Sequence, residues 1–501
     1  MLMKTLIKKI RKAGTFLKSC RIFIGKNPRE LHAPCLVIFP VSRTCLHCGF
    51  AGLMTVQSGN RTSSTKYDEH PVSLWGKIEK AGLKDILKGN IPVRQYLHGL
   101  KTLQAMENAV ARLKEERIQE SIFFREEARE RLAALAKKMK ATLEKEEQML
   151  EDHAAEFSSR DLEDINSRLV LLKDLQWALE KDILNNFSRI MALAAVRKAG
   201  DLRPAAFKKY RKIVLLLNAL NRLEVRGRDS AGLQITFTLK SEKDLETIIF
   251  EIQKANLYEE YLRRLREGDA LNGSICAAED GAHPGKPSLV FSFTYKTFSV
   301  VGELGRNARE LENAIKQDDI FRIFAGKSTR CETAFMHTRW ASVGSITEEN
   351  CHPVNNYRPN KKASPYPLYA ASRANISVIL NGDIDNYGAL RESLNLDREP
   401  INPLVTTDTK IIPLQIEKYL QEGHLLKEAF RLAVNRFEGS HAIAMTCDLE
   451  PGKFFLALKG SGQSIYVGVS EDQYMFSSEV YGLVEVDRKS TRLNSSHSLL
   501  S

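Results

Sequence analysis

The chain has 501 residues, 43% hydrophobic and 8% aromatic, which is enough for roughly two to four domains with sizeable cores. Its longest apolar runs, at 35–41 and 213–220, are far shorter than the roughly 20 residues that cross a bilayer, so no membrane span is expected. The net charge of +12 lies mostly at the ends: residues 1–47 contribute +9 and residues 487–501 contribute +2, leaving +1 for the body. This distribution argues against a basic nucleic-acid-binding face.

The first segment, 1–47, is basic and almost free of acidic residues, and it runs into CLHCGFAG at 45–52. Its composition is compatible with an organelle presequence, a leader or propeptide that is processed away, or a start codon assigned too early. Cys45 and Cys48 could be half of a zinc site, a redox pair or a nucleophile with a neighbour. The sequence contains no second ligand-like Cys or His pair, so zinc is disfavoured and no metal is expected. Without a convincing secretory signal, we expect reduced thiols and a cytoplasmic location.

Residues 61–200 form the second segment, which is rich in Ala, Leu, Glu, Lys and Arg from about 101 onward. Apolar residues three and four apart, such as Leu132, Leu135 and Met139, predict long amphipathic helices with coiled-coil-like spacing. Ser158 followed by Asp161 has the spacing of a helix N-terminal cap, so we expect a second long helix to begin there. The spacing predicts an inserted long α-helical hairpin, which is either a solvated insertion or a dimerisation arm. A homodimer is therefore one expectation.

The third segment, 201–486, alternates short apolar strands with few helices. Strands are predicted at 233–240, 288–295, 334–341, 376–382, 441–447, 453–459, 464–470 and 473–478, and helices near 243–267, 306–318, 387–394 and 408–437. The helices are too few for a parallel sheet built from strand–helix–strand units. We therefore predict an α+β fold in which helices cover antiparallel sheets.

The last segment, 487–501, reads DRKSTRLNSSHSLLS and breaks the preceding pattern. It resembles the translation of a sequencing-library adaptor, so we expect the natural chain to continue past 486 and the present chain to be an N-terminal fragment. A genuine disordered tail is the alternative.

Five stretches carry the strongest functional signal: CGFAG at 48–52, RLEVRGRDSAG at 222–232, HTRWASVG at 337–344, NGDIDNYGALRE at 381–392 and TTDTK at 406–410. In this order they resemble the glutaminase domain of the glutamine–fructose-6-phosphate aminotransferases (glucosamine-6-phosphate synthases), which are class II, N-terminal-nucleophile amidotransferases. The resemblance covers 48–59 and, with interruptions, 211–486, and we assign 48–60 and 201–486 to this domain. It implies a four-layer α/β/β/α sandwich. It also implies hydrolysis of L-glutamine, with ammonia passed to fructose 6-phosphate in a C-terminal sugar domain that this chain lacks.

Amide hydrolysis without a metal or cofactor needs a nucleophile, a base and donors for the developing oxyanion. The resemblance assigns the nucleophile to Cys48, whose own α-amine would be the base because its ordinary pKa is near 8. It assigns Asn381 and Gly382 to the oxyanion hole, through a side-chain amide and a backbone N–H. Taken singly, Cys48 could be a buried structural cysteine and Asn-Gly a plain turn.

The resemblance also assigns residues to substrate binding. Arg339 would hold the glutamine α-carboxylate, Asp408 would face the α-ammonium, and Trp340 and Ser342 would belong to a loop that covers glutamine. Arg226 would support the surroundings of the nucleophile. The plainer alternatives are surface ion pairs for Arg339 and Asp408, a core aromatic for Trp340 and a helix C-cap for Arg226.

Three departures from the family pattern are visible. Ser342 and Val343 replace Thr and His of the covering loop, and Leu380 replaces the His that precedes Asn-Gly. The largest departure is that His47 precedes Cys48, which makes the nitrogen of Cys48 an amide. We therefore expect residues 1–47 to be removed or not made. The alternatives are a class II amidotransferase with another ammonia acceptor, and a non-catalytic scaffold or partner-binding module of the same fold.

Overall fold

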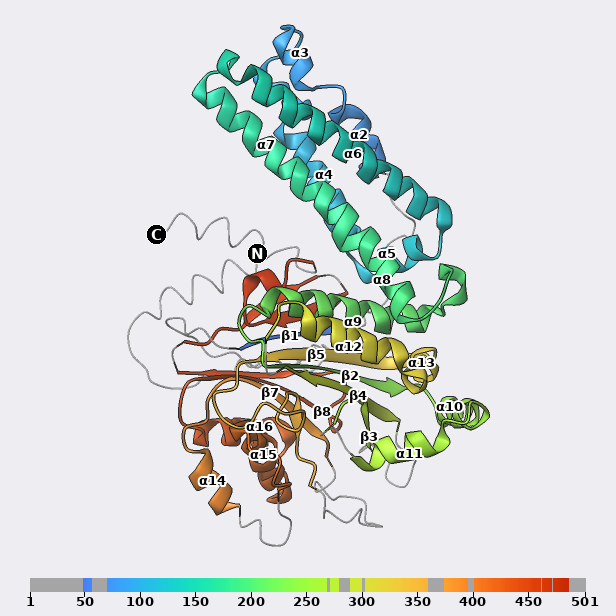
Figure 1. The fold of residues 1–501 in the computed structure, drawn as a ribbon, viewed down its shortest axis with the longest axis vertical. Coiled ribbons are helices and arrows are strands. Elements are labelled where there is room, and N and C mark those ends of the chain that lie inside the picture. The colour runs from blue at the N-terminus through green and yellow to red at the C-terminus, as the bar shows by residue number, and fades with distance from the viewer. Residues whose placement is uncertain are drawn as a thin grey trace, which may run out of the picture.

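Two antiparallel sheets form the centre of the molecule (Figure 1). The computed structural model describes residues 48–55, 70–267, 271–278, 289–299, 302–358, 374–394, 401–460, 462–470 and 472–485. The leader 1–47, the end of the 48–60 segment and the tail 487–501, which the sequence singled out, lie outside these residues.

The larger sheet has seven strands in the order β10-β11-β1-β5-β2-β4-β3. Its strands are β1 (Gly49–Thr55), β2 (Ser230–Leu239), β3 (Ser274–Ala278), β4 (Val290–Phe298), β5 (Thr329–Arg339), β10 (Tyr466–Val469) and β11 (Gln473–Ser477). All ten residues of β2 are buried, because both faces of the sheet centre are covered. The short β1 lies between β5 and β11, so strands from distant parts of the sequence flank it.

The smaller sheet has four strands in the order β6-β7-β8-β9. They are β6 (Val354–Asn355), β7 (Ile376–Gly382), β8 (His441–Cys447) and β9 (Phe455–Lys459). A shared apolar core joins the two sheets, with Phe50, Phe335 and Phe476 from the larger sheet packed among residues of β7 and β8. The register of β7 on β8 places Asn381 and Gly382 at the end of the strand, opposite Ala442 and His441.

Helices close both outer faces. On the larger sheet, α9 (Pro204–Leu223) contacts β1 and β5, and α12 (Arg306–Gln317) contacts β2 and β4. On the smaller sheet, α15 (Ile411–Gln421) contacts β7 and α16 (Leu426–Arg436) contacts β9. The remaining helices of this part are α10 (Glu242–Lys254), α11 (Tyr258–Glu267), α13 (Asp319–Ala325) and α14 (Tyr387–Ser393). The arrangement is the predicted α/β/β/α sandwich, in which a helical layer, the larger sheet, the smaller sheet and a second helical layer are stacked in this order (Figure 1).

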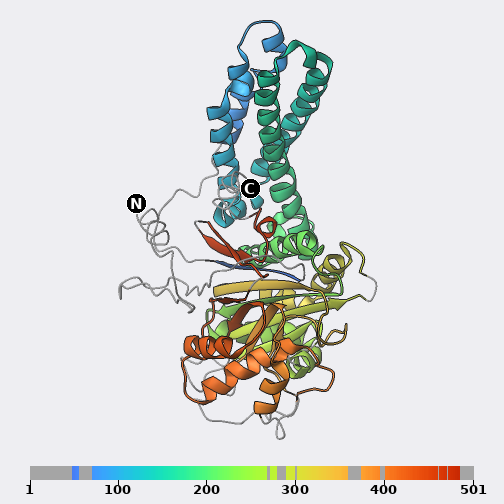
Figure 2. The same cartoon turned by 90° about the vertical axis from the view of Figure 1, so that its left-hand side faces the viewer.

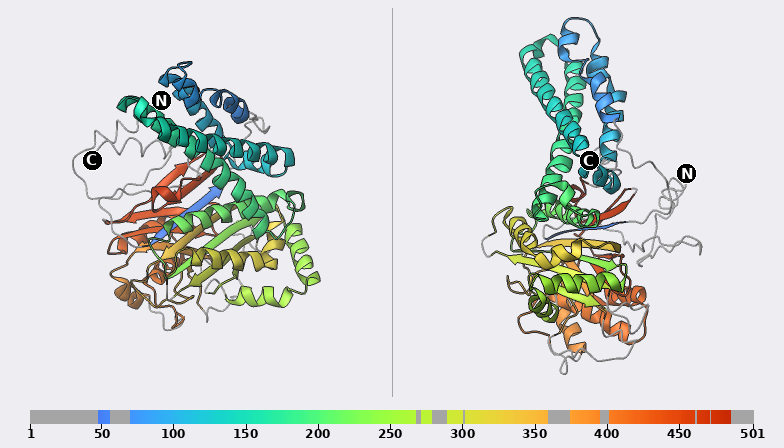
Figure 3. Two further views of the ribbon diagram at one scale, coloured as in Figure 1. Left: turned by 45° about the horizontal axis from the view of Figure 1, so that its top comes forward. Right: turned by 90° about the vertical axis from the view of Figure 1, so that its right-hand side faces the viewer.

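The helical segment lies on the side of the larger sheet that α9 and α12 cover, away from the smaller sheet (Figures 2 and 3). Its longest members, α6 (Glu126–His153) and α7 (Ser159–Trp177), form the predicted antiparallel hairpin, and Ser158 caps α7 by accepting a hydrogen bond from the N–H of Asp161 at 3.2 Å. More helices pack beside this hairpin than the sequence indicated: α2 (His70–Ile78), α3 (Leu83–Leu87), α4 (Leu100–Arg112) and α5 (Glu116–Phe123). Beyond the hairpin, α7 continues through a π-helical stretch at Ala178–Asn185 into α8 (Asn186–Leu193), which contacts α9. The segment is thus a bundle whose centre is the hairpin.

Buried ion pairs connect this bundle to the larger sheet through α9. Lys212 lies 2.9 Å from Glu116 of α5 and 2.8 Å from Glu332 of β5, and Lys209 lies 3.0 Å from Glu332. All four side chains are buried. Charges in such surroundings are tolerated only when they are paired, so the network ties bundle and sheet into one packed unit.

Across the part of the chain that the structure describes, no helix combines the length and apolar character needed to cross a bilayer.

Candidate active site

Cys48 lies at the point where β1 begins, beside the end of β5. The strand pairing sets Gly49 opposite Thr338, and this brings the thiol to the residue that follows β5: the N–H of Trp340 donates a hydrogen bond to Sγ of Cys48 at 3.2 Å. The nitrogen of Cys48 donates to the carbonyl oxygen of Arg226 at 3.2 Å. Cys48 has a φ of +63°, a value that side chains other than Gly, Asn and Asp rarely adopt. Such outliers are frequent at functional sites.

Burial raises the pKa of the Cys48 thiol to about 12, although the Trp340 N–H and the charge of Arg339 act in the opposite direction. The thiol is therefore protonated at neutral pH. A nucleophilic role would require a base that removes this proton during the reaction, because the thiolate is the reactive form.

Asn381 reaches Cys48 from the smaller sheet. Its Nδ2 donates to the carbonyl oxygen of Cys48 at 3.3 Å, so the N–H₂ end of the amide faces the cysteine. The oxygen end of the Asn381 amide contacts a histidine. Nε2 of His337 lies 3.1 Å from Oδ1 of Asn381 and 2.7 Å from the carbonyl oxygen of Leu380. Asn381 is buried and thus offers a preorganised donor beside the backbone of Cys48.

Gly382 follows directly and needs to be glycine. Its φ is +89°, and a Cβ at this position would come within 2.0 Å of the carbonyl oxygen of Ser440. The absence of a side chain lets the end of β7 turn tightly against the residue before β8.

Arg339 is buried at the end of β5, where its guanidinium donates to the carbonyl oxygens of Ser345, at 3.1 Å, and Val343. It thus organises the loop that follows β5. Further along this loop, Ser342 donates to a carboxylate oxygen of Asp383 at 2.5 Å, which links the loop to the segment after Gly382. Trp340 is half-exposed on the same loop.

Asp408 lies across the site in the turn before α15. Its carboxylate accepts a hydrogen bond from the N–H of Ile384 at 2.8 Å. Burial raises the pKa of Asp408, the Ile384 N–H lowers it, and the nearby Asp383 raises it further. A buried carboxylate with a raised pKa gains from a cation, which is the charge that the expected glutamine ammonium would supply.

Arg226 contacts the cysteine through its backbone only. Its side chain turns instead to the C-terminal part of the domain, where it pairs with Glu479 and donates to the hydroxyl of Tyr481 at 3.3 Å. The helix-capping alternative does not describe this geometry, since the guanidinium leaves α9 altogether.

Three residues of this neighbourhood were not singled out from the sequence as site residues. His337 and His352 lie buried with ring centroids 4.3 Å apart, and Asp229 accepts the N–H of Ala341 at 2.8 Å, which holds the loop after β5. His337 is the first residue of the HTRWASVG stretch, so the sequence identified the motif but gave no role for its histidine. The partner that gives it a role, Asn381, lies on another sheet.

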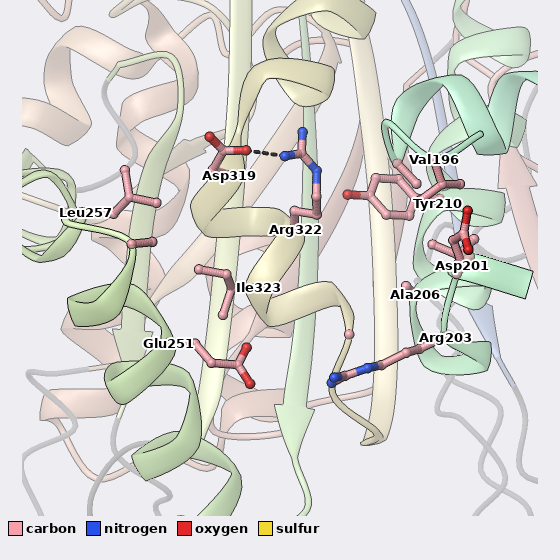
Figure 4. Close-up of a pocket in the computed structure, with 14 residues that line it drawn as sticks. Val196, Asp201, Arg203, Ala206, Tyr210, Glu251, Leu257, Asp319, Arg322 and Ile323 are labelled. Carbon is pink, nitrogen blue, oxygen red and sulfur yellow. Dashed lines mark hydrogen bonds and ion pairs between the residues drawn. The ribbon is translucent and has the colours of Figure 1, made fainter. Parts of the chain in front are cut away.

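A cavity of about 440 Å³ lies elsewhere, between α9, α10 and α13 near the base of the helical bundle (Figure 4). Arg322 lines it and pairs with Asp319, while Tyr210 and Glu251 also border it. None of the expected catalytic or substrate-binding residues line this cavity. Among the described residues, no group of three or more His, Cys, Asp or Glu is arranged to hold a metal ion.

The comparisons with known proteins agree with this geometry at the level of a domain. Residues 359–485 match the family described as "Glutamine amidotransferase domain". The matched residues include β7 to β11 of the α/β/β/α sandwich, so this part of the chain is similar to glutamine amidotransferase domains.

The curated relatives of this chain include glutamine–fructose-6-phosphate aminotransferases. The glutamine–fructose-6-phosphate aminotransferase (isomerizing) of Clostridium tetani is 36% identical over 144 residues, which are 29% of this chain and 20% of the relative. That of Methanothermobacter thermautotrophicus is 35% identical over 144 residues, 29% of this chain and 21% of the relative. The matched region thus spans about a fifth of these relatives' length.

Among solved structures, a glutamine phosphoribosylpyrophosphate amidotransferase from B. subtilis is similar, with 16% identity, a TM-score of 0.29, and coverage of 51% of this chain and 43% of that chain.

Proposed function

We propose that this chain hydrolyses the side-chain amide of L-glutamine with Cys48 as the nucleophile. The observation that carries the proposal is the convergence on one cysteine of a backbone N–H from the end of β5 and a side-chain amide from the end of β7. Acyl transfer requires a nucleophile with preorganised donors close to it, and Cys48 has one donor at its thiol and one at its backbone carbonyl oxygen.

The reaction would proceed in two stages. Sγ of Cys48 attacks the amide carbon as the thiol proton passes to a base, and Asn381 with the Gly382 N–H stabilises the oxyanion. The tetrahedral intermediate collapses to a γ-glutamyl thioester as the same proton passes to the leaving nitrogen, which departs as ammonia. Water then hydrolyses the thioester to glutamate and restores the thiol.

Substrate recognition would rest on Arg339 for the α-carboxylate and Asp408 for the α-ammonium, with Trp340 and Ser342 covering the bound glutamine. The guanidinium of Arg339 donates to loop carbonyls in this structure. We therefore expect glutamine to engage its remaining donors or to rearrange this loop.

The base would be the α-amine of Cys48, once the bond to His47 is cut. As an amide, this nitrogen has no free electron pair for a proton, and it donates to Arg226. The raised pKa of the thiol supports this step, because it keeps Cys48 protonated at neutral pH until a base removes the proton. Intact mass and N-terminal sequencing of the purified protein test it, and full activity with residues 1–47 still attached contradicts it.

We also propose that the ammonia serves fructose 6-phosphate, as the names of the curated relatives state for those proteins. The transfer would take place in a sugar-binding part outside the matched region. A different ammonia acceptor would leave the glutaminase chemistry unchanged.

We also propose a reducing, cytoplasmic location, because the described cysteines are all free thiols.

The decisive experiment measures glutamate release from glutamine by the full chain and by a chain that begins at Cys48. Cys48→Ala should abolish release, whereas Cys276→Ala, at another partly buried cysteine, should not. If neither chain releases glutamate, the alternative function, a non-catalytic scaffold, is favoured. The observation that favours a scaffold is that the nitrogen of Cys48 is an amide and cannot act as a base.

A further inference from the structure

His337 contacts the proposed oxyanion donor from the side opposite the nucleophile. It lies on β5 and is fully buried between the two sheets. Its Nε2 lies 2.7 Å from the carbonyl oxygen of Leu380 and 3.1 Å from Oδ1 of Asn381. A ring from the larger sheet thereby reaches the last two residues before Gly382 on the smaller one.

The hydrogen-bond partners fix the tautomer of this ring. A backbone carbonyl oxygen such as that of Leu380 can only accept, so Nε2 of His337 carries the hydrogen. The amide atom of Asn381 that faces the same N–H must then be its oxygen, and the N–H₂ group is turned toward Cys48, where it donates to the carbonyl oxygen at 3.3 Å. The two contacts agree on one orientation of an amide that could otherwise be flipped.

A second histidine keeps the first in place. The His352 ring packs against His337 at 4.3 Å between centroids, and its Nε2 lies 2.8 Å from the hydroxyl oxygen of Thr409, the neighbour of Asp408. Burial lowers the pKa of His337 to about 3 and that of His352 well below its usual value, so both rings are uncharged at neutral pH. The pair brings no positive charge that would compete with Asn381 for the oxyanion.

We infer that His337 is a positioning residue that holds the Asn381 amide with its N–H₂ group toward the reacting carbon. The inference rests on the proposed glutaminase function and deepens it. The side chain of Leu380 is apolar, so the polar contact to Oδ1 of Asn381 comes from the His337 ring on β5. His337 would touch neither glutamine nor Cys48 and would act through Asn381 alone.

The test compares His337→Leu with His337→Gln in whichever form of the chain hydrolyses glutamine. Leu removes the donor, and Gln can place an N–H₂ group near the position of Nε2. Loss of a full oxyanion donor lowers kcat about 100- to 1,000-fold, so we expect a loss of about 10- to 100-fold for Leu with KM changed less than about threefold. His337→Gln should recover kcat to within about fivefold of wild type.

A double-mutant cycle shows whether the effect passes through Asn381. In an Asn381→Ala background, His337→Leu should change kcat by less than about twofold, because the group it orients is already gone. A tenfold loss in that background, or equal losses for Leu and Gln, would overturn the inference.

An aldehyde analogue of glutamine gives a second readout if His337→Leu fails to fold. The analogue forms a tetrahedral adduct with Cys48 whose oxyanion occupies the same donors, whereas glutamate forms none. His337→Asn, which retains a polar side chain but shortens its reach, should weaken the aldehyde about tenfold and leave glutamate binding unchanged; equal weakening of both refutes the inference. Absence of Cys48-dependent hydrolysis in the wild type would instead refute the proposed function, and the inference with it.

Discussion

Glu332 offers the sharpest test of how the helical bundle is held to the sheets. Its carboxylate accepts from Lys212 at 2.8 Å, from Lys209 at 3.0 Å and from the hydroxyl of Thr329 at 2.6 Å. Burial by itself would raise the pKa of Glu332, but the two lysine charges outweigh it and hold the pKa well below the usual value. The site therefore contains a carboxylate that is fully charged at neutral pH.

Glu332→Gln keeps the size of the side chain and removes its charge. Lys209 would then be left without a carboxylate, with the carbonyl oxygens of Lys327 at 2.8 Å and Ala205 at 3.3 Å as its acceptors, while Lys212 keeps Glu116. Removing one partner of a buried ion pair typically costs about 3–5 kcal/mol, because an uncompensated charge remains out of water. Since Lys209 keeps two carbonyl acceptors, we expect the lower end, about 3 kcal/mol.

Urea unfolding followed by circular dichroism measures this loss at pH 7. The matched control is Glu147→Gln, which breaks the pair with Lys173 between α6 and α7. That pair has the same 3.0 Å separation, but its side chains are 66% and 43% exposed, so the change should cost less than about 1 kcal/mol. A loss below about 1 kcal/mol for Glu332→Gln, or equal losses for the two variants, would refute the reasoning.

Three further predictions concern the site and the bundle. Gly382→Ala should lower kcat for glutamine about 100-fold or more, because its Cβ would meet the Ser440 carbonyl oxygen at 2.0 Å and displace the proposed oxyanion donor. Gly388→Ala, whose Cβ meets nothing within 4 Å, should leave kcat unchanged, and equal rates for the two variants would contradict this prediction. Ser158→Ala should lower the free energy of unfolding by about 1 kcal/mol in urea titrations, and no change would show that the cap is not needed. Because the folded pKa of His337 is about 3 and the unfolded one about 6.5, its contribution to stability is complete above pH 6.5 and falls as the pH drops toward 3. Between pH 7 and pH 5 the wild type should lose about 2 kcal/mol more than His337→Gln, and parallel losses would contradict the assignment.

Local pattern was enough to predict most elements of the sandwich. The stretch ISVILNG predicted a strand that the structure has as β7, and the strand at 441–447 coincides with β8. The helix expected over 408–437 is instead divided into α15 and α16 at Gly423, which has a φ of +90°, and the one over 243–267 is divided at Asn256, with a φ of +58°. Residues with a left-handed backbone conformation end helices. The sequence alone does not predict whether an isolated Gly or Asn within a periodic stretch adopts a positive φ.

The helical segment shows the limit of periodicity. The hairpin of α6 and α7 followed from long apolar repeats, while α2 and α3 are short and their sequence is mixed. Short helices gain little from their own hydrogen bonds and depend on tertiary packing, which no local repeat encodes.

The sequence by itself determined which side chains could do the chemistry: Cys48 ahead of a strand, and Asn381 with Gly382 at the end of another. Only the tertiary structure decided how they meet. The place of β1 between β5 and β11 sets Cys48 against Trp340, and the packing of one sheet on the other brings His337 behind Asn381. The physical reason is that residue type and spacing are local, whereas strand order and the facing of two sheets follow from burying both apolar faces at once.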